Sequence, residues 1–445
     1  MHKSLLIPAL LLTALLAGCA DDEPPAADED PARPPPAEPS WNLTAPAGAT
    51  ALEPAARLAF SDGEAFPRAA GVWAHGDYVF GSALGSGFFV ADLSDPAAPV
   101  LLWNATTDAG GTDDTEDTIT SFARDADVLL QDDRLVLVLA TQSDGMHVWD
   151  VTEPADPAFL ARVFDESVPN HNVAVVPGTD LVFNSQSGGA GRTNDLVDLS
   201  DPAHPVVLGA YGTHGCHDIT FFGAAGDERF RAYCAGIQRT EIWDLSGLDP
   251  DATDFGIHLV ATVEAQDSPV VGNPVFGSYP ARTLHHLAMV NQDASVLIVG
   301  DEHNGGGSPG TCLGYEDTTG LSTPFGALWF YDLGDEAAPR LLSWFSPPAV
   351  LPAGVTTEGD PTTLLLRDVP NCTAHFGTLV PGEEKLVMAW YSAGVLLIDF
   401  SDPTNPRLLD QFQPADGINT WDARVHGGYV FTGDMVRGMD VLKLV

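Results

Sequence analysis

Residues 392–409 read Ser-Ala-Gly-Val-Leu-Leu-Ile-Asp-Phe-Ser-Asp-Pro-Thr-Asn-Pro-Arg-Leu-Leu, and this stretch decides the fold. It has an apolar segment that ends at Asp399, then Ser401-Asp402-Pro403, a second proline and a new apolar segment. Short runs of Val, Leu, Ile and Phe bounded by Gly, Asp and Pro are typical of β-strands. Ser and Asp side chains bond nearby backbone amides and Pro fixes φ, which favours a tight turn. The stretch therefore predicts two strands joined by a turn.

The same pattern occurs seven times along the chain. Consecutive copies are 58, 48, 46, 88, 67 and 41 residues apart, measured between their aspartates. The shorter spacings match a four-stranded propeller blade of roughly 40–50 residues, and the longer ones require loop insertions. We expect each aspartate to end the third strand of a blade and to cap the turn that follows. The seven are Asp92, Asp150, Asp198, Asp244, Asp332, Asp399 and Asp440.

The last copy has no fourth strand after it. The segment Leu52–Phe60 has the Pro-x-x-x-Leu pattern of a fourth strand and would complete that blade. Completing it would remove an exposed sheet edge and close the ring. Residues 51–445 are therefore predicted to be all-β, a seven-bladed β-propeller closed by an N-terminal strand.

Two segments precede this domain. Residues 1–19 contain the apolar run Leu5–Leu16 and end in Leu16-Ala17-Gly18-Cys19. The run is too short to span a bilayer comfortably and is typical of a signal peptide. Small residues before a cysteine resemble a lipobox with Cys19 lipidated, and an ordinary signal peptide with an incidental cysteine is the alternative. Residues 20–50, rich in Pro, Ala, Asp and Glu, predict a disordered tether.

The repeats are similar to those of a known family. Leu396-Leu397-Ile398-Asp399 followed by Ser-Asp-Pro-x-x-Pro resembles the LVIVD repeat of secreted and surface-anchored propellers in bacteria and archaea. The chain as a whole, over about Ala51–Val445, looks like the related choice-of-anchor B type proteins. The resemblance implies a propeller on a lipid anchor at the outer face of the cytoplasmic membrane. It implies little about activity.

The chain is strongly acidic. Its formal net charge is −43, from 62 acidic and 19 basic residues, and its lysines are Lys3, Lys385 and Lys443. Such a surface repels nucleic acid and anionic lipid, so neither is an expected partner. High salt screens this self-repulsion. Two interpretations remain open: a salt-tolerant organism, or an acidic secreted protein from a GC-rich genome.

Four cysteines follow Cys19, and export would place them in an oxidising compartment. Cys216 is expected to begin the first strand of blade 4 and Cys234 to end the strand beside it, which favours a Cys216–Cys234 disulfide. Cys312 and Cys372, both expected in long loops, form the second predicted pair, although three pairings exist in principle. Asn-x-Ser/Thr sequons, which mark candidate glycosylation sites, begin at Asn42, Asn104 and Asn371.

The histidines show a second recurring pattern. When the first strands of the blades are aligned by apolar alternation, His171-Asn172-Val173 matches His217-Asp218-Ile219 and His285-His286-Leu287. The motif Val-Pro-Gly, shared by two blades, places His375 opposite His171. In blade 7 the same position is Trp421, followed by an aspartate.

The first strand of every propeller blade is innermost, so equivalent positions form a ring around the channel. The alignment puts Ala70 and about Ala126 at this position in blades 1 and 2. Four imidazoles, with Asp218 and His286 beside them, are therefore expected at one mouth. Imidazole binds zinc, copper, iron or nickel, so we consider a Zn or Cu site with an open position. A structural role, with each histidine fastening its blade to a neighbour, is equally compatible with the recurrence.

Two further clusters contain metal-binding residue types. Asp301-Glu302-His303 opens a glycine-rich loop and could reach the same mouth. Residues 113–117, with four acidic side chains, could hold Ca²⁺ but lack the EF-hand spacing. The sequence contains no nucleophile elbow, Walker loop, dinucleotide fingerprint or His-Glu-x-x-His motif.

The sequence thus supports two functions. The first is a monomeric, lipid-anchored surface propeller that acts as a binding or scaffold module for another surface protein or a small ligand. Insertions at Asp249–Arg282 and Ser346–Asn371 would be its recognition loops. The second is a metal-binding protein or metalloenzyme, with enzymatic activity left undecided. Its ligands would be His171, His217, His285 or His286, and His375.

Overall fold

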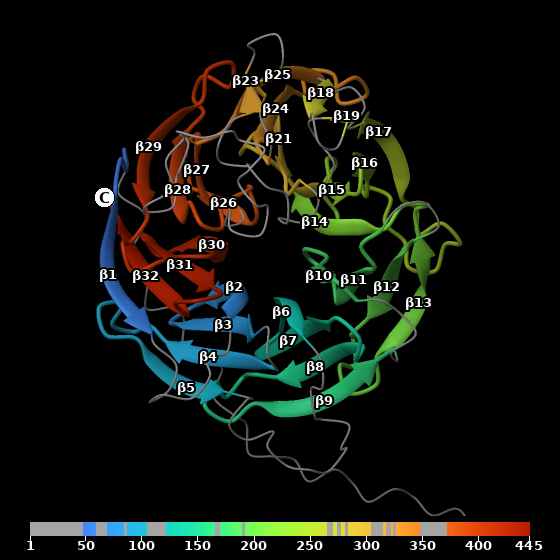
Figure 1. Ribbon diagram of the computed structural model, residues 1–445. Coiled ribbons are helices and arrows are strands. Elements are labelled where there is room, and N and C mark those ends of the chain that lie inside the picture. Colours follow the sequence, from blue (N-terminus) through green and yellow to red (C-terminus); the bar gives the residue numbers. More distant parts are fainter. Residues whose placement is uncertain are drawn as a thin grey trace, which may run out of the picture. The chain divides into compact units, whose positions relative to one another are not determined.

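The computed structural model describes residues 48–58, 69–83, 87–104, 122–164, 170–188, 192–264, 270–273, 277–280, 284–303, 315–316, 322–323, 326–347 and 372–445. Their regular elements are all β-strands, and seven four-stranded antiparallel sheets stand around a central axis (Figure 1). The predicted seven-bladed β-propeller is confirmed. The predicted signal peptide and most of the tether, with Cys19, lie outside the described residues.

In blades 1 to 4 the strands follow chain order from the axis outward. Blade 1 consists of β2 (Ala69–His75), β3 (Tyr78–Ala83), β4 (Phe88–Asp92) and β5 (Val100–Asn104). Blade 2 consists of β6 (Ala123–Gln131), β7 (Arg134–Thr141), β8 (Met146–Asp150) and β9 (Ala158–Val163). Blade 3 consists of β10 (Asn172–Val175), β11 (Leu181–Ser185), β12 (Asn194–Asp198) and β13 (Val206–Tyr211). Blade 4 consists of β14 (Cys216–Phe222), β15 (Arg231–Gly236), β16 (Arg239–Asp244) and β17 (His258–Glu264).

The remaining blades carry the insertions and the closure. Blade 5 consists of β20 (His285–Val290), β21 (Val296–Asp301), β24 (Leu328–Asp332) and β25 (Arg340–Phe345). Blade 6 consists of β26 (Gly377–Leu379), β27 (Lys385–Ala389), β28 (Val395–Asp399) and β29 (Arg407–Phe412). Blade 7 consists of β30 (Thr420–His426), β31 (Tyr429–Asp434), β32 (Met439–Leu444) and β1 (Leu52–Leu58). Outside the blades, β18 (Val270–Asn273) pairs with β19 (Gly277–Pro280), and β22 (Tyr315–Glu316) with β23 (Ser322–Thr323).

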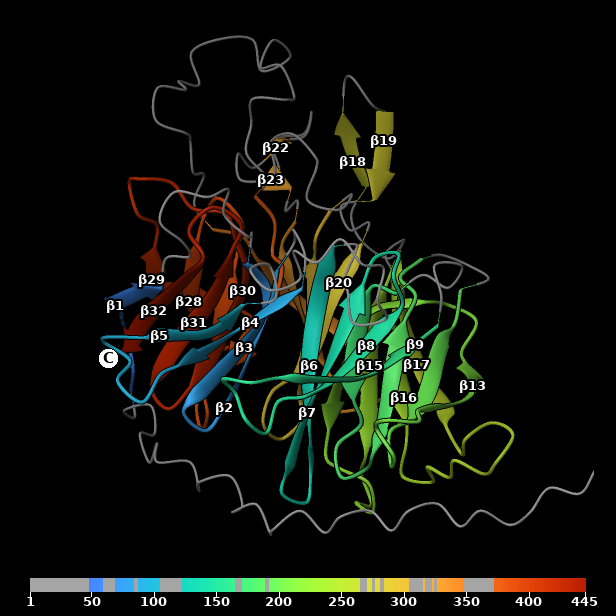
Figure 2. The same ribbon diagram turned by 90° about the horizontal axis from the view of Figure 1, so that it is seen from below.

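The ring closes through the N-terminal strand, as predicted. β1 pairs antiparallel with β32 over their whole length, from Leu52 opposite Leu444 to Leu58 opposite Met439. Leu52 and Leu58 are buried because each packs into the core beside blade 7. Figure 2 shows the ring from the side, with the blade strands running between its two faces.

The predicted turn chemistry is present in six blades. The first aspartate of each turn, such as Asp92, accepts a hydrogen bond from the amide two residues later, at 2.8 Å for Ser94. The equivalent bonds of Asp150, Asp198, Asp244, Asp332 and Asp399 are 2.8–2.9 Å long.

The expectation for Asp440 is wrong, because it lies near the start of β32 and not at its end. In blade 7 the third strand continues to Leu444 to pair with β1, so it has no turn to cap. Asp440 instead binds Arg437, with Nε–Oδ2 at 2.7 Å.

The apolar faces of neighbouring blades pack together and hold the inner strands in place. The cluster between blades 2 and 3, for example, joins Val136 and Val148 to Val173 and Val197. Because the middle strands are buried on both faces, they read as continuous apolar runs and not as alternating ones. The Cys216–Cys234 disulfide, the first of the two expected pairs, links β14 to β15.

Candidate metal centre at the channel mouth

A β-bulge near the start of the innermost strand positions the key side chains. In blade 4, Cys216 pairs with Gly236 and Asp218 pairs with Ala235, which leaves His217 unpaired between them. Blades 5 and 7 have the same irregularity, which leaves His286 and Trp421 unpaired. A bulge bends the strand and redirects the extra residue, and such irregularities are frequent beside functional sites.

The equivalent residues of blades 3 and 6 lie just outside their first strands, His171 directly before β10 and His375 two residues before β26. The amide of His171 donates to Ser185 O at 2.9 Å, and that of His375 donates to Ala389 O at 3.0 Å. In blade 2 the bulged residue is Arg124, not Ala126 as the alignment suggested. In blade 1 it is Ala70, as expected.

The alignment of blade 5 was one residue off. The register of β20 places His286 at the ring position and His285 one residue earlier, opposite Asp301. His285 Nδ1 instead bonds Thr240 Oγ1 of blade 4 at 2.9 Å, so this histidine fastens two blades together. The error arose because β20 is buried along its whole length, so apolar alternation alone does not fix its register.

Five aromatic rings from consecutive blades stack in a row around the mouth. The first four are the predicted imidazoles, and the fifth is the indole of blade 7. Their centroids are 4.1 Å apart for His171 and His217, 4.0 Å for His217 and His286, 3.8 Å for His286 and His375, and 4.3 Å for His375 and Trp421.

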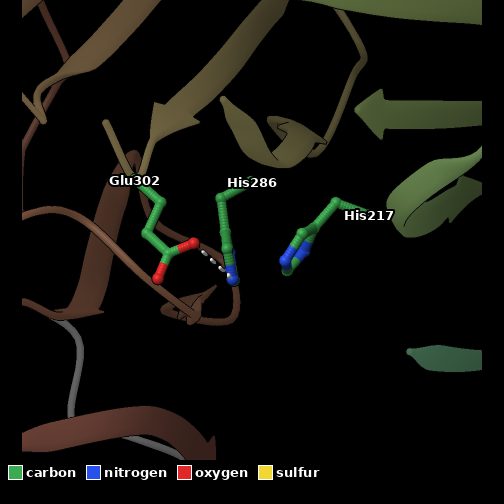
Figure 3. A group of neighbouring side chains, drawn as sticks. All are labelled: His217, His286 and Glu302. Atoms are coloured by element: carbon green, nitrogen blue, oxygen red, sulfur yellow. Dashed lines mark ion pairs between the residues drawn. The ribbon is translucent and has the colours of Figure 1, made fainter. Parts of the chain in front are cut away.

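A carboxylate completes the group. Glu302 directly follows β21, and its amide donates to Leu284 O at 2.9 Å, which holds its side chain toward the histidines (Figure 3). Its Oε2 is 3.9 Å from His286 Nε2, and its Oε1 is 3.7 Å from His375 Nε2. His217, His286 and Glu302 each offer one ligand atom, and these three atoms lie within 4.8 Å of one another.

Tyr391 holds Glu302 in position. Its hydroxyl donates to Glu302 Oε1 at 2.5 Å. The backbone of Tyr391 is left-handed, with φ 44°, a strained conformation for a residue other than glycine. Two backbone hydrogen bonds to Thr420, of 3.1 and 3.0 Å, fasten this residue to blade 7. Strain that is retained beside a buried polar group indicates a functional constraint.

The imidazoles are uncharged near neutral pH. Burial lowers the pKa of His171 to about 4 and lowers the pKa values of His217, His286 and His375 well below the ordinary value. Neighbouring imidazoles lower the last three further through charge repulsion. Burial also raises the pKa of Glu302 to about 7, although the bond from Tyr391 opposes this shift. Neutral imidazole is the form that binds a metal.

Several ring nitrogens are buried without a hydrogen bond. Within the described part of the chain, Nδ1 and Nε2 of His286 and Nε2 of His375 have no partner of ordinary geometry. The same holds for Nδ1 of His217. Leaving a buried polar atom unsatisfied costs about 1–3 kcal/mol, so these atoms require an explanation. A lone pair kept for a metal ion explains one nitrogen of each ring, while the other nitrogen of His286 carries an N–H.

His171 differs from the other three. The side-chain amide of Asn172 lies 2.5 Å from His171 Nδ1 and 2.8 Å from the backbone carbonyl oxygen of His217. A carbonyl only accepts, so the amide presents its nitrogen and donates to both atoms. His171 therefore accepts at Nδ1 and carries its proton on Nε2. It belongs to the ring, and its role as a ligand stays a prediction; the bond from Asn172 occupies its Nδ1, so we leave it out of the proposed ligand set.

Asp218, also predicted as a metal residue, lies in a different group of charges. Burial raises its pKa to about 7, while Arg424 acts in the opposite direction. Arg424 donates to Asp422 Oδ2 within β30 at 2.9 Å. The same Oδ2 accepts from Val72 N of β2 at 2.9 Å, and Asp125 Oδ2 accepts from Val173 N of β10 at 3.2 Å. Because such bonds connect neighbouring inner strands, we assign this group to the structure of the channel.

A cavity of about 370 Å³ opens beside the ring. Its polar wall includes Arg124, His217, Glu302 and His375, and its apolar wall includes Trp421. Any ion bound by the histidines and Glu302 would face this space.

Sequence reasoning missed Arg124 and Tyr391. Arg124 becomes visible only once the bulge is counted in blade 2. Tyr391 follows β27 and gave no signal, because its proximity to Glu302 depends on two different blades meeting.

Other predicted sites have mixed outcomes. Asn104 ends β5 and is only 9% exposed, an unfavourable place for a glycan, so its glycosylation stays a prediction. Residues 113–117, Cys312, Asn42 and Asn371 lie outside the described residues. The Cys312–Cys372 bond therefore also stays a prediction.

The comparisons with known proteins agree with this fold. Two similar solved structures are the WD40 repeats of RRP9 (TM-score 0.51, 8% identity, covering 88% of this chain and 100% of that chain) and the β-propeller domain of Cps50 (Swd1) from Myceliophteria thermophila (TM-score 0.52, 10% identity, covering 87% and 100%). At these identities the likeness concerns the fold alone. No curated protein matches the sequence.

The fold and the ring define a seven-bladed β-propeller with a histidine-lined channel mouth. The family model of the LVIVD repeat matches residues 68–107 and 191–213, which cover blade 1 and the two outer strands of blade 3. The chain is an LVIVD-repeat β-propeller, an architecture consistent with a binding or scaffold module. Among the described residues, no helix is long and apolar enough to cross a membrane.

Proposed function

We propose that this propeller binds one divalent transition-metal ion through His217, His286, His375 and Glu302. The observation that carries the proposal is the buried, unsatisfied nitrogens of these imidazoles beside a carboxylate. His285, in contrast, bonds Thr240 of the neighbouring blade through its Nδ1, although its Nε2 also makes no hydrogen bond to the described residues.

The ligand set narrows the choice of metal. Imidazole with one carboxylate suits zinc, copper, iron or nickel. Ligand atoms about 2.1 Å from one such ion lie roughly 3–3.5 Å apart, so the separations of 3.7 and 3.9 Å to Glu302 require a modest contraction. Four protein ligands approach from the ring, and a further position would face the cavity. A metal held in this way can bind or polarise a small ligand.

Metal analysis of the purified chain tests the proposal. We expect about one equivalent of metal per chain after expression with Zn, Cu, Fe, Mn and Ni supplied. The double variant His217→Ala, His375→Ala should lose it, whereas His204→Ala, on the exposed turn beside Asp201, should retain it. Circular dichroism verifies that the variants fold. Less than about half an equivalent in the folded wild type would refute the metal site and leave a scaffold function.

We also propose that the protein acts at the cell surface, anchored by lipid at Cys19. The support is the apolar run Leu5–Leu16 and the small residues before Cys19. A diacylglyceryl group supplies the two chains that stable anchoring needs. Replacing Cys19 by Ala should move the protein from the membrane fraction to the medium. An unchanged distribution would contradict the anchor. We also propose that the chain is related to the choice-of-anchor B type proteins, which it resembles as a whole.

A further inference from the structure

We infer that the cavity beside the histidine ring binds a small carboxylate ligand, whose anionic group lies between Arg124 and the metal position. This inference rests on the proposed metal site and adds the chemical class of its ligand. It is carried by the position and bonding of Arg124.

Arg124 occupies the same bulge position in blade 2 as the histidines occupy in theirs. It lines the cavity together with His217 and Glu302. Its side chain therefore faces the same space as the ring, and blade 2 adjoins blade 3, which carries His171.

The bonding of Arg124 is unusual for this chain. Nη2 donates to Gln142 Oε1 at 2.8 Å, while Nε is buried and has no hydrogen bond within the described residues. None of the described carboxylates lies within 4.0 Å of its guanidinium, although the chain has 62 acidic residues. By contrast, Arg424 and Arg437 each bind aspartates. A guanidinium with donors to spare matches a planar carboxylate.

The rest of the cavity limits the ligand further. Trp421, Ile237, Leu284 and Met435 provide an apolar and aromatic wall. The volume of about 370 Å³ is at the small end of ligand pockets, which span roughly 300–1,000 Å³. The ligand therefore has one carboxylate at the polar end and a short apolar or aromatic body against Trp421. The net charge of −43 repels anions from the surface, so capture depends on these local positive groups.

The test uses the full chain loaded with Co²⁺, titrated with benzoate as the carboxylate probe and benzyl alcohol as its neutral counterpart. Benzoate should change the visible Co²⁺ spectrum in a saturable way, and benzyl alcohol should not. Arg124→Gln should weaken benzoate binding at least about tenfold while Co²⁺ content stays unchanged. Arg124→Lys keeps the charge but loses the planar pair of donors, so its affinity for benzoate should lie between those of the wild type and Arg124→Gln. Arg134→Gln, which removes a surface ion pair with Asp150, is the matched control.

The outcomes separate the two proposals. Equal binding of benzoate by Arg124→Gln and wild type, or equal effects of benzoate and benzyl alcohol, would overturn the carboxylate site while leaving the metal site intact. If the chain takes up no metal, calorimetric titration of the metal-free protein decides. Arg124-dependent benzoate binding would then support the carboxylate site alone, and its absence would overturn it. If Arg124→Gln fails to fold, the Arg124→Lys variant provides the same comparison.

Discussion

His375 donates its Nδ1 proton to the carbonyl oxygen of Trp421, 2.6 Å away in the next blade. A carbonyl only accepts, so this bond fixes the tautomer of the neutral ring. The lone pair is therefore on Nε2, which faces Glu302 Oε1 at 3.7 Å. Metal-binding histidines are commonly oriented in this way by a bond from their other nitrogen. The fold thus prepares one ligand of the proposed site before any ion arrives.

Tyr391→Phe should weaken metal binding without abolishing it. The lost hydroxyl donates to Glu302 and holds down the pKa of that carboxyl, which is already about 7. Without it the pKa rises further, so more of Glu302 is protonated at pH 7 and the metal competes with a proton. We expect about a tenfold loss of affinity at pH 7, measured by chelator competition. The loss should shrink at pH 9, where Glu302 is ionised in both proteins.

Tyr211→Phe is the control for this experiment. Its hydroxyl also makes one hydrogen bond, to Ile257 O at 3.2 Å, but this bond lies at the outer part of the propeller. The control should leave metal affinity unchanged. Equal affinities for Tyr391→Phe and wild type at pH 7 would show that Tyr391 does not position Glu302.

The closing strand should contribute strongly to stability. Leu58 is 6% exposed and packs among buried residues of blades 1 and 7. Leu58→Ala leaves a cavity there and should lower the free energy of unfolding by about 2–4 kcal/mol in urea denaturation. Leu130→Ala, at a position 55% exposed, should change it by less than about 0.5 kcal/mol. Similar losses in the two variants would mean that β1 does not fasten the ring.

The fold was predictable because its signals are local. The aspartate-capped turn repeats its chemistry in six of the seven copies, and a turn needs only the residues within it. The closing strand was also predictable, because a blade with three strands leaves an edge that another segment must cover. Asp440 failed because the repeat was aligned three residues too early in blade 7: Lys443 lies opposite Tyr429 as Asp92 lies opposite Tyr78 in blade 1.

The candidate site was only partly predictable. The sequence placed His171, His217 and His375 on one ring, because each lies at the same distance from an apolar strand pattern. It placed His285 at the ring position that His286 occupies, because β20 is buried on both faces and its apolar pattern does not fix the register. The tie from Tyr391 to Glu302 spans 89 residues and depends on neighbouring blades, and sequence spacing carries no information on such a contact.

Asp127→Asn should change how stability depends on pH. Asp127 accepts from Val175 N at 2.8 Å, and burial raises its pKa from 3.8 to about 6. The folded state therefore keeps this proton to a higher pH than the unfolded state does. The resulting stability is fully present below about pH 4 and is lost as the pH rises to about 6.

The side-chain amide in Asp127→Asn does not titrate, so the variant lacks this pH dependence. Relative to Asp127→Asn, the metal-free wild type should lose up to about 3 kcal/mol of unfolding free energy between pH 4 and 6, with no further change above. Urea denaturation at a series of pH values measures this difference. A difference that stays constant from pH 4 to 7 would contradict the raised pKa. Asp132→Asn, at a turn between β6 and β7, provides the control.

The Cys216–Cys234 disulfide should support both stability and the proposed metal site. Cys216 directly precedes His217, so the bond to β15 restrains the bulge that presents this ligand. The double variant Cys216→Ala, Cys234→Ala should lose about 3 kcal/mol of stability, because the bond links residues 18 apart. Its metal affinity at 10 °C, where the variant remains folded, should fall several-fold. Thermal unfolding and chelator competition measure the two effects separately. Lower stability with unchanged affinity would show that the bulge alone, without the covalent restraint, holds His217 in place.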